Sequence, residues 1–136
     1  GGTVQIFFHE KYYTIPATRL SDGTLRYLSL LAILYNPYKS SLICIEEPEL
    51  GLHPDILPTI ADILKEVSTD KQIVVTTHSN IIIDALTTSP EDVIVCENES
   101  GYTTMKRLKK SDLKEWLETY TLGELWSKGQ IGGNRF

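Results

Sequence analysis

The sequence has few cysteines, no long apolar run and a shortage of basic residues, and each of these limits what the chain can be. Among its 136 residues there are two cysteines, Cys44 and Cys96. Both stand among aliphatic residues of expected strands and lack close partners, so we expect them to pack in the core rather than form a disulfide or metal site. No apolar run approaches the roughly 20 residues of a membrane-spanning helix, and the amino end lacks the features of a secretory signal. We therefore expect a cytoplasmic protein that enters no membrane.

The charge balance argues against a nucleic-acid-binding face on this segment alone. The chain has 13 lysines and arginines against 18 aspartates and glutamates, which gives a formal net charge of −5. Proteins normally bind nucleic acids through basic surface patches. The one small basic cluster, Lys106, Arg107, Lys109 and Lys110, is more typical of a solvated strand end. Length and a 41% hydrophobic content predict one compact domain over residues 1–136 with a modest core.

Apolar patterns in the middle of the chain alternate between strand and helix. Strands are expected over 42–45, 72–77 and 92–97, and helices over 56–67 and 80–86. Strands separated by helices favour a parallel sheet with right-handed crossovers and helices on its faces. The sequence therefore predicts an α/β domain.

The flanking segments predict hairpins and a further helix. Short strands are expected over 5–8 and 12–15, and a strand over 102–108 should pair with the one before it. Ser111 is expected to cap a helix that carries Leu113, Trp116, Leu117 and Tyr120. The glycine-rich tail over 121–136 is expected to pack only in part.

Two adjacent acids, Glu46 and Glu47, follow the apolar strand over 42–45. Ligands of parallel sheets bind just beyond the carboxyl ends of the strands, so both carboxylates should project where a phosphate would lie. One acid can hold Mg²⁺, usually through water, and the next can orient or deprotonate an attacking water. The alternative is a solvated acidic turn after a core strand.

Two further segments place functional groups at the ends of expected elements. Ser21 or Asp22 can cap a helix that continues to about Asn36, and its free amide groups, helix dipole and Gly23 suit an anion. An ordinary helix cap with a nearby glycine is the alternative. His78 follows the strand over 72–77, where a neutral imidazole can contact a phosphate, although a lone histidine is more often structural.

Together these segments resemble ABC-type ATPase heads, especially the branch of RecF-like, SMC-like and OLD-family proteins and related AAA ATPases. The resemblance is strong over residues 19–86 and weak beyond them. It implies the C-terminal lobe of a P-loop NTPase head, with a mostly parallel sheet flanked by helices and a small β-hairpin. It also implies ATP and Mg²⁺ as cofactors.

The resemblance assigns roles to individual residues. The segment over 20–26 resembles the signature motif, which would place Ser21, Asp22, Gly23 and Arg26 at the γ-phosphate of a nucleotide bound to the opposite subunit. The segment over 43–49 resembles Walker B, with Glu46 as the magnesium ligand where the family usually has aspartate, and Glu47 as the catalytic glutamate. His78 matches the switch histidine.

The segment Leu50 to Pro54 resembles the D-loop, which crosses the dimer interface in this family. His53 stands where transporters often carry an acid. The alternative for this segment is a simple turn, with Gly51 as a turn glycine and His53 as a solvated side chain.

A glycine-rich loop ending in Gly-Lys-Ser or Gly-Lys-Thr does not occur in the sequence. Hydrolysis should therefore require a missing N-terminal Walker A lobe, supplied in cis or by a second chain, and the isolated chain should be inactive. Two such heads would form a homodimer around two nucleotides, linked to nucleic-acid processing through other domains or to phage defence.

Two other functions remain open from the sequence. The first is a non-catalytic interaction or dimerisation module that retains the ATPase fold. The second is a metal-dependent nuclease that uses Glu46, Glu47, Glu49 and His53.

Overall fold

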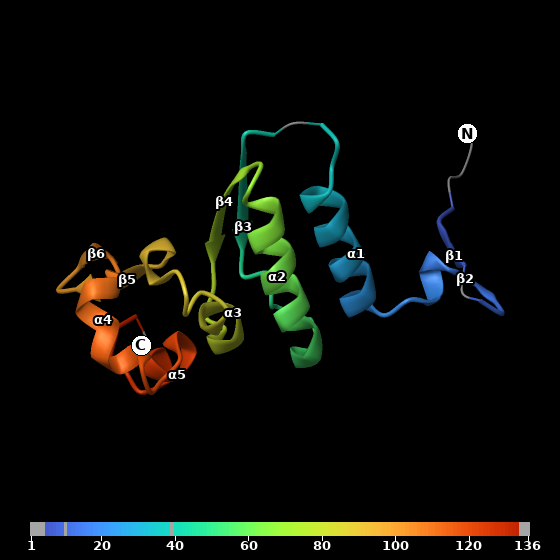
Figure 1. Cartoon of the computed structure of the whole chain (residues 1–136). Coiled ribbons are helices and arrows are strands. Elements are labelled where there is room, and N and C mark those ends of the chain that lie inside the picture. Colours follow the sequence, from blue (N-terminus) through green and yellow to red (C-terminus); the bar gives the residue numbers. More distant parts are fainter. Residues whose placement is uncertain (1–4, 10, 39, 134–136) are drawn as a thin grey trace.

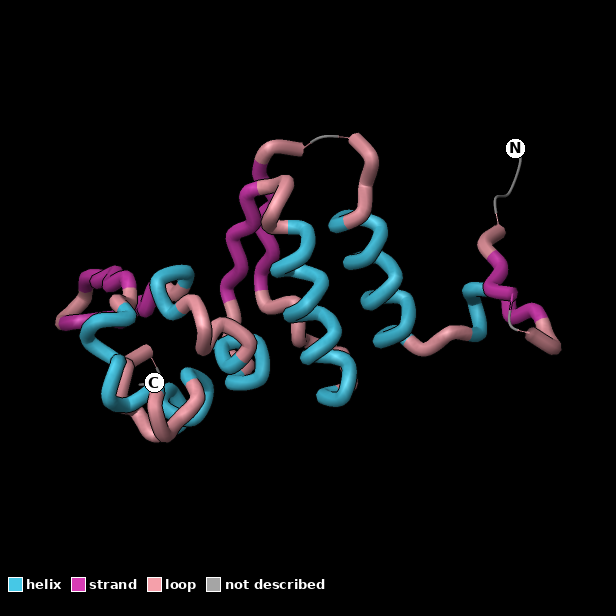
Figure 2. The backbone as a smooth tube through the Cα atoms, in the orientation of Figure 1, coloured by secondary structure: helices cyan, strands magenta, loops and turns pink. Residues whose placement is uncertain are grey.

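The computed structural model describes residues 5–9, 11–38 and 40–133 (Figure 1). Helices and strands alternate along the chain, as Figure 2 shows. In chain order the elements are β1 (Phe7–His9), β2 (Thr14–Pro16), α1 (Asp22–Leu34), β3 (Leu42–Glu46), α2 (Leu57–Val67), β4 (Gln72–Thr76), α3 (Asn80–Asp84), β5 (Ile94–Glu99), β6 (Tyr102–Arg107), α4 (Lys110–Leu117) and α5 (Leu122–Ser127), with 3-10 turns at Ala17–Arg19, Pro54–Ile56 and Pro90–Asp92.

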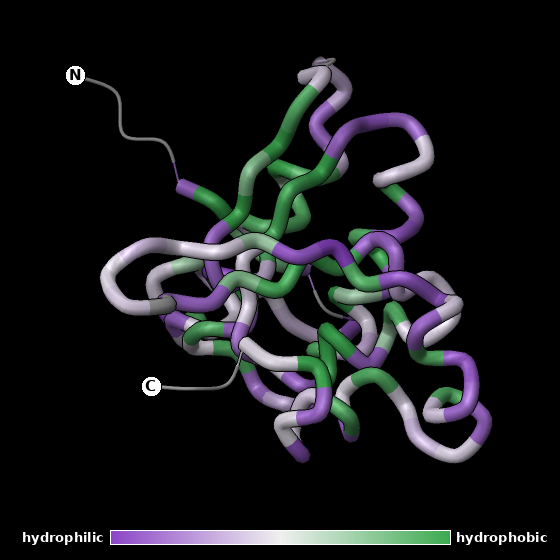
Figure 3. Tube along the Cα trace, turned by 90° about the vertical axis from the view of Figure 1, so that its left-hand side faces the viewer, coloured by the Kyte–Doolittle hydropathy of each residue, from purple (hydrophilic) through white to green (hydrophobic). Residues whose placement is uncertain are grey.

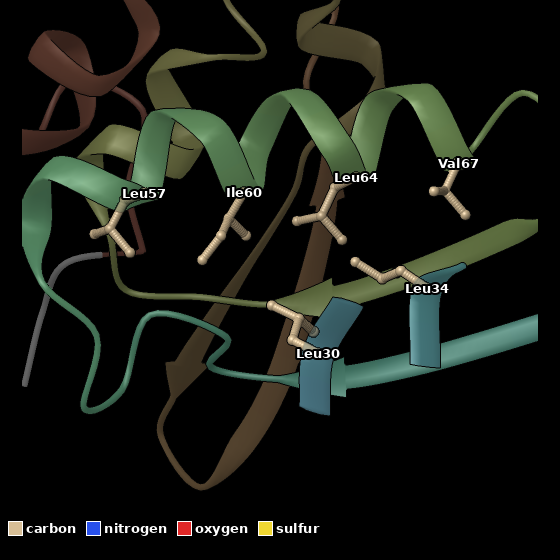
Figure 4. Close-up of a cluster of buried hydrophobic side chains, with 6 residues drawn as sticks. All are labelled: Leu30, Leu34, Leu57, Ile60, Leu64 and Val67. Carbon is tan, nitrogen blue, oxygen red and sulfur yellow. The ribbon is translucent and has the colours of Figure 1, made fainter. Parts of the chain in front are cut away.

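The centre of the fold is a parallel pair of strands covered on one face by helices. Strands β3 and β4 pair in register from Leu42 opposite Gln72 to Glu46 opposite Thr76, which confirms the expected parallel pairing. Helices α1 and α2 lie side by side against this pair (Figure 1). Their buried residues, drawn in Figure 4, recur at helical spacing: Leu30, Leu34, Leu57, Ile60, Leu64 and Val67. Burying each such side chain contributes about 1.5–3 kcal/mol.

The opposite face of β3 and β4 is exposed. Leu42 is 49% exposed and Val74 is 47% exposed. Cys44 and Cys96 are exposed too, so the expectation that both pack in the core is wrong. Successive side chains of a strand point to opposite faces, and the buried Ile43 and Val95 take the inward positions next to each cysteine.

The third strand of the middle region does not join the parallel pair. Strand β5 pairs with β6 in an antiparallel hairpin, and β1 pairs with β2 in another, so among the described residues one of the three two-stranded sheets is parallel. The β5–β6 turn is closed locally, because the amide of Gly101 donates to Oδ1 of Asn98 at 3.2 Å and Gly101 adopts a φ of 94°. A short loop has a low closure entropy, which favours this local partner over a distant strand.

A second cluster of buried residues lies in the carboxyl-terminal part. It comprises Ile83, Val95, Leu108 and Leu122, so α3 links the two clusters. Ser111 does not cap α4, because the helix begins at Lys110 and the Ser111 hydroxyl bonds Oδ1 of Asp112 instead. The tail contains a helix that was not expected.

That unexpected helix, α5, is closed by a reciprocal cap. Thr121 accepts from the backbone of Glu124, and the Glu124 carboxylate accepts from the backbone of Thr121. The threonine followed three residues later by glutamate was the sequence signal for this helix start. Leu122 and Leu125 are fully buried.

Replacing Gly123 by alanine is expected to lower the free energy of unfolding by about 1–3 kcal/mol. A Cβ at Gly123 would overlap the carbonyl oxygen of Asn80 and lie 2.9 Å from Cβ of Asp84. Urea unfolding curves measure the change. Ser111→Ala, on the exposed surface of α4, is the matched control and should change stability by less than about 0.5 kcal/mol. An unchanged midpoint for Gly123→Ala would show that α3 and α5 are not packed this closely.

Hydrophobic residues are distributed in short stretches along the chain (Figure 3). Within the part of the chain that the structure describes, no helix has the length and apolar character needed to cross a membrane.

Candidate functional site

The expected site residues collect at one end of the parallel pair. Strands β3 and β4 end beside each other, with Glu46 opposite Thr76, and Glu47 and His78 follow these strand ends. The amino end of α1 lies at the same end of the molecule, the lower edge of Figure 1. The structure thus places the carboxylates at the mouth of the sheet.

Glu47 occupies a strained turn immediately after β3. Its φ is 43°, in the left-handed region that costs a residue with a side chain about 1–2 kcal/mol. Two backbone hydrogen bonds hold this conformation: Glu47 N donates to Thr76 O at 2.8 Å, and Leu50 N donates to Glu47 O at 3.1 Å. Strain of this kind often accompanies functional sites. The turn fixes where the Glu47 carboxylate points.

The structure brings Glu47 and His78 together. Nε2 of His78 lies 3.5 Å from Oε1 of Glu47, and the imidazole is 59% exposed. The ring therefore lies at an accessible edge rather than among aliphatic side chains. A carboxylate beside an imidazole can orient the ring and can compete with it for a proton.

Glu49 connects the two strand ends, a role that the sequence analysis did not assign to it. Its Oε1 accepts hydrogen bonds from Oγ1 of Thr77 at 2.6 Å and from N of His78 at 2.8 Å. Its Oε2 is buried and makes no hydrogen bond among the described residues. The only sequence signal was a third acid close to the strand end, because the residues that Glu49 contacts lie 28 and 29 positions away.

The acids do not form a metal cluster of the nuclease type. Glu49 is committed to Thr77 and His78, and Nδ1 of His53 accepts from the backbone of Asp55 at 3.3 Å. Among the described residues no three His, Cys, Asp or Glu side chains are grouped to hold an ion. Mg²⁺ needs only one or two carboxylates when water and phosphate oxygens complete its shell. The exposed carboxylate of Glu46 at the strand end suits that mode of binding.

Ser21 caps α1 as predicted. Its Oγ accepts from N of Thr24 at 3.1 Å and lies 2.8 Å from Oγ1 of Thr24. Either hydroxyl can be the donor of this second bond. When Thr24 donates, the Ser21 proton can point outward to an anion near the amides of Asp22 and Gly23.

The start of α1 packs against the loop that follows β3. A Cβ on Gly23 would lie 2.9 Å from Gly51 O, and Gly51 itself has a φ of 73°. Arg26 lies against Gly51 from the next helical turn, because Nη1 is 3.1 Å from the position of a Gly51 Cβ. The two segments line a hollow of about 540 Å³, formed by Ser21, Gly23, Thr24, Tyr27, Gly51, Leu52, His53, Pro54 and Ile56.

Comparisons with known proteins agree with this fold. Residues 3–84 match the model of a family described as "AAA domain, putative AbiEii toxin, Type IV TA system". A structure from work on ATP-driven dimerization and DNA-stimulated activation of SMC ATPases is similar with a TM-score of 0.65 and 16% identity, over 86% of this chain and 72% of that chain.

A second similar structure is the SmcHead bound to the C-winged helix domain of ScpA. Its TM-score is 0.62 and its identity is 16%, over 76% of this chain and 31% of that chain. The chain thus spans about a third of that SmcHead chain. No curated protein sequence matches significantly.

Proposed function

Because this chain belongs to the AAA domain family matched over residues 3–84 and has the α/β fold of an SMC-like ATPase head, we propose that it is the catalytic C-terminal lobe of an ATP-hydrolysing head. The observation that carries the proposal is the pairing of Glu47 with His78 at the carboxyl end of β3 and β4. Phosphate-binding sites of parallel sheets lie at this end.

Each site residue has a chemical role in this proposal. Glu47 accepts a proton from the water that attacks the γ-phosphate, and His78 contacts the phosphate that this attack releases. Glu46 would hold Mg²⁺, directly or through water, and the ion would supply positive charge to the phosphate oxygens. The helix start at Ser21, Asp22 and Gly23 offers amide donors and a positive dipole to the γ-phosphate of the opposite subunit, with Arg26 adding positive charge nearby.

The exposed face of β3 and β4 supports a missing partner lobe. This sheet face carries apolar side chains that include Leu42 and Val74, each about half exposed, and it is suited to cover by another layer. The proposed cover is the Walker A lobe, in cis or in a second chain, which would supply the phosphate loop that this sequence lacks.

Isothermal titration calorimetry with ATP and Mg²⁺ tests this proposal. The chain alone should bind little nucleotide, and the chain completed by its Walker A lobe should bind ATP in a magnesium-dependent manner and hydrolyse it. The metal-chelated head serves as the control. Absence of binding by the completed head would instead support the non-catalytic interaction module.

A link to nucleic acid or phage defence is also part of the proposal. It rests on the family description, which names a putative toxin, and on the DNA-stimulated activation of SMC ATPases. The net charge of −5 argues against a nucleic-acid-binding face on this chain alone, so the proposed contact lies on other domains or partners. Added double-stranded DNA should therefore stimulate the assembled protein but not bind this chain alone.

A further inference from the structure

Glu49 is the residue that joins the loop after β3 to the switch-histidine segment. A single carboxylate oxygen, Oε1, receives two hydrogen bonds from consecutive residues, Thr77 and His78. Hydrogen bonds to a charged acceptor are shorter and stronger than neutral ones, and the bond from Thr77 is 2.6 Å long. The backbone of His78 is therefore hydrogen-bonded directly to the Glu49 carboxylate.

The effect of Glu49 extends along the chain. Oγ1 of Thr77, which donates to Glu49, accepts from N of Ser79 at 3.0 Å. Ser79 in turn caps α3 by accepting from N of Ile82 at 3.4 Å. One carboxylate thus orders the three residues around His78 and the start of the next helix.

The environment of the second carboxylate oxygen of Glu49 indicates that this glutamate does not serve mainly to stabilise the fold. Oε2 is shielded from solvent and makes no hydrogen bond among the described residues, which is unfavourable for a carboxylate. A buried group with this cost beside Glu47 and His78 points to a functional demand on Glu49.

We propose that Glu49 is a positioning residue for the switch histidine, holding the His78 backbone so that the imidazole stays beside Glu47. The kinetic part of this inference rests on the proposed ATPase function. Glu49 acts through His78, so it should affect the chemical step more than nucleotide binding.

Two conservative variants of Glu49 distinguish the effect of side-chain length, or reach, from the effect of the negative charge. Glu49→Gln keeps an oxygen at the position of Oε1 and loses the charge, whereas Glu49→Asp keeps the charge and retracts the oxygen by one methylene. If hydrogen bonding sets the position of His78, the glutamine variant should resemble wild type and the aspartate variant should not. Glu115→Gln and Glu115→Asp, on the exposed surface of α4, are the matched controls.

Amide hydrogen exchange in the 136-residue chain tests the structural step without nucleotide. Exchange at the His78 amide should be about tenfold faster than wild type in Glu49→Asp and near wild type in Glu49→Gln. Loss of one hydrogen bond raises the equilibrium constant for local opening of the amide by about tenfold, and the exchange rate follows this constant. Unchanged exchange in Glu49→Asp would overturn the proposal. If that variant does not fold, Thr77→Val removes one donor at similar volume, and unchanged His78 exchange in it would overturn the proposal equally.

Kinetics of the completed head test the functional step. Glu49→Asp should lower kcat roughly 10- to 100-fold, the effect of a small misplacement of a reacting group, and leave the KM for ATP within about twofold. Loss of turnover in Glu49→Gln together with wild-type turnover in Glu49→Asp would show that charge, not reach, matters, and would overturn the proposal. If the wild-type head hydrolyses no ATP, the proposed function fails, while exchange at His78 still decides the role of Glu49.

Discussion

Glu47→Gln should stop ATP turnover by the completed head while ATP stays bound. Glutamine has the size of glutamate and can occupy the same turn, but its amide cannot accept the proton of the attacking water. A general base contributes about 10²- to 10⁴-fold to a rate, so kcat should fall by at least 100-fold. The measurement is single-turnover hydrolysis of radiolabelled ATP, followed by recovery of the nucleotide that remains on the protein.

The control for this prediction is another acid of the same domain. Glu66 is exposed at the end of α2, where its carboxylate accepts from the Tyr35 hydroxyl at 3.3 Å. Glu66→Gln should therefore leave turnover unchanged. Normal turnover by Glu47→Gln would remove Glu47 from the role of base and leave the pairing with His78 without its proposed purpose.

Mixing two inactive variants should restore activity if the signature segment acts on the opposite subunit. Ser21→Asp keeps a good helix cap, because aspartate caps as well as serine, and places a negative charge where the γ-phosphate would lie. A head with Ser21→Asp and a head with Glu47→Gln should each be inactive alone. In a mixed dimer, the subunit with Ser21→Asp keeps its own Glu47 and faces the unaltered Ser21 of the Glu47→Gln subunit. One of the two sites of the dimer is therefore intact.

Random exchange of subunits makes half of the dimers mixed, so activity should recover to about a quarter of the wild-type rate. The measurement is steady-state phosphate release at equal total protein. Energy transfer between subunits that carry different fluorescent labels provides the control for exchange. If the two inactive variants stay inactive together although subunits exchange, Ser21 does not serve the site of its partner.

Local signals made much of the fold predictable from the sequence. Ser21 starts α1 because a serine before a helical apolar pattern satisfies the first free amides. Strand β3 ends at its first acid because the apolar run ends there. The position of His78 after β4 followed from the same kind of pattern, and these three local predictions sufficed to place the candidate site.

Features that depend on contacts distant in sequence were not predictable in this way. The apolar run around Cys44 suggested two buried faces, but the structure covers only the face that carries Ile43. The pairing of β5 with β6 was predicted and is confirmed, but the described residues of β5 do not join the parallel pair that the alternation of elements suggested. The hydrogen bond from the His78 amide to Glu49 spans 29 positions, and no periodic pattern in the sequence predicts it.

The backbone conformation of Glu47 separates folding from chemistry at this one position. Glycine or asparagine would adopt the φ of 43° found at Glu47 at a lower conformational cost than glutamate, since these residues enter the left-handed region easily. Folding alone would therefore favour a smaller residue there. Under the proposed function, selection for thermal stability without a demand for turnover would favour such a residue and remove the carboxylate that is proposed to act on water.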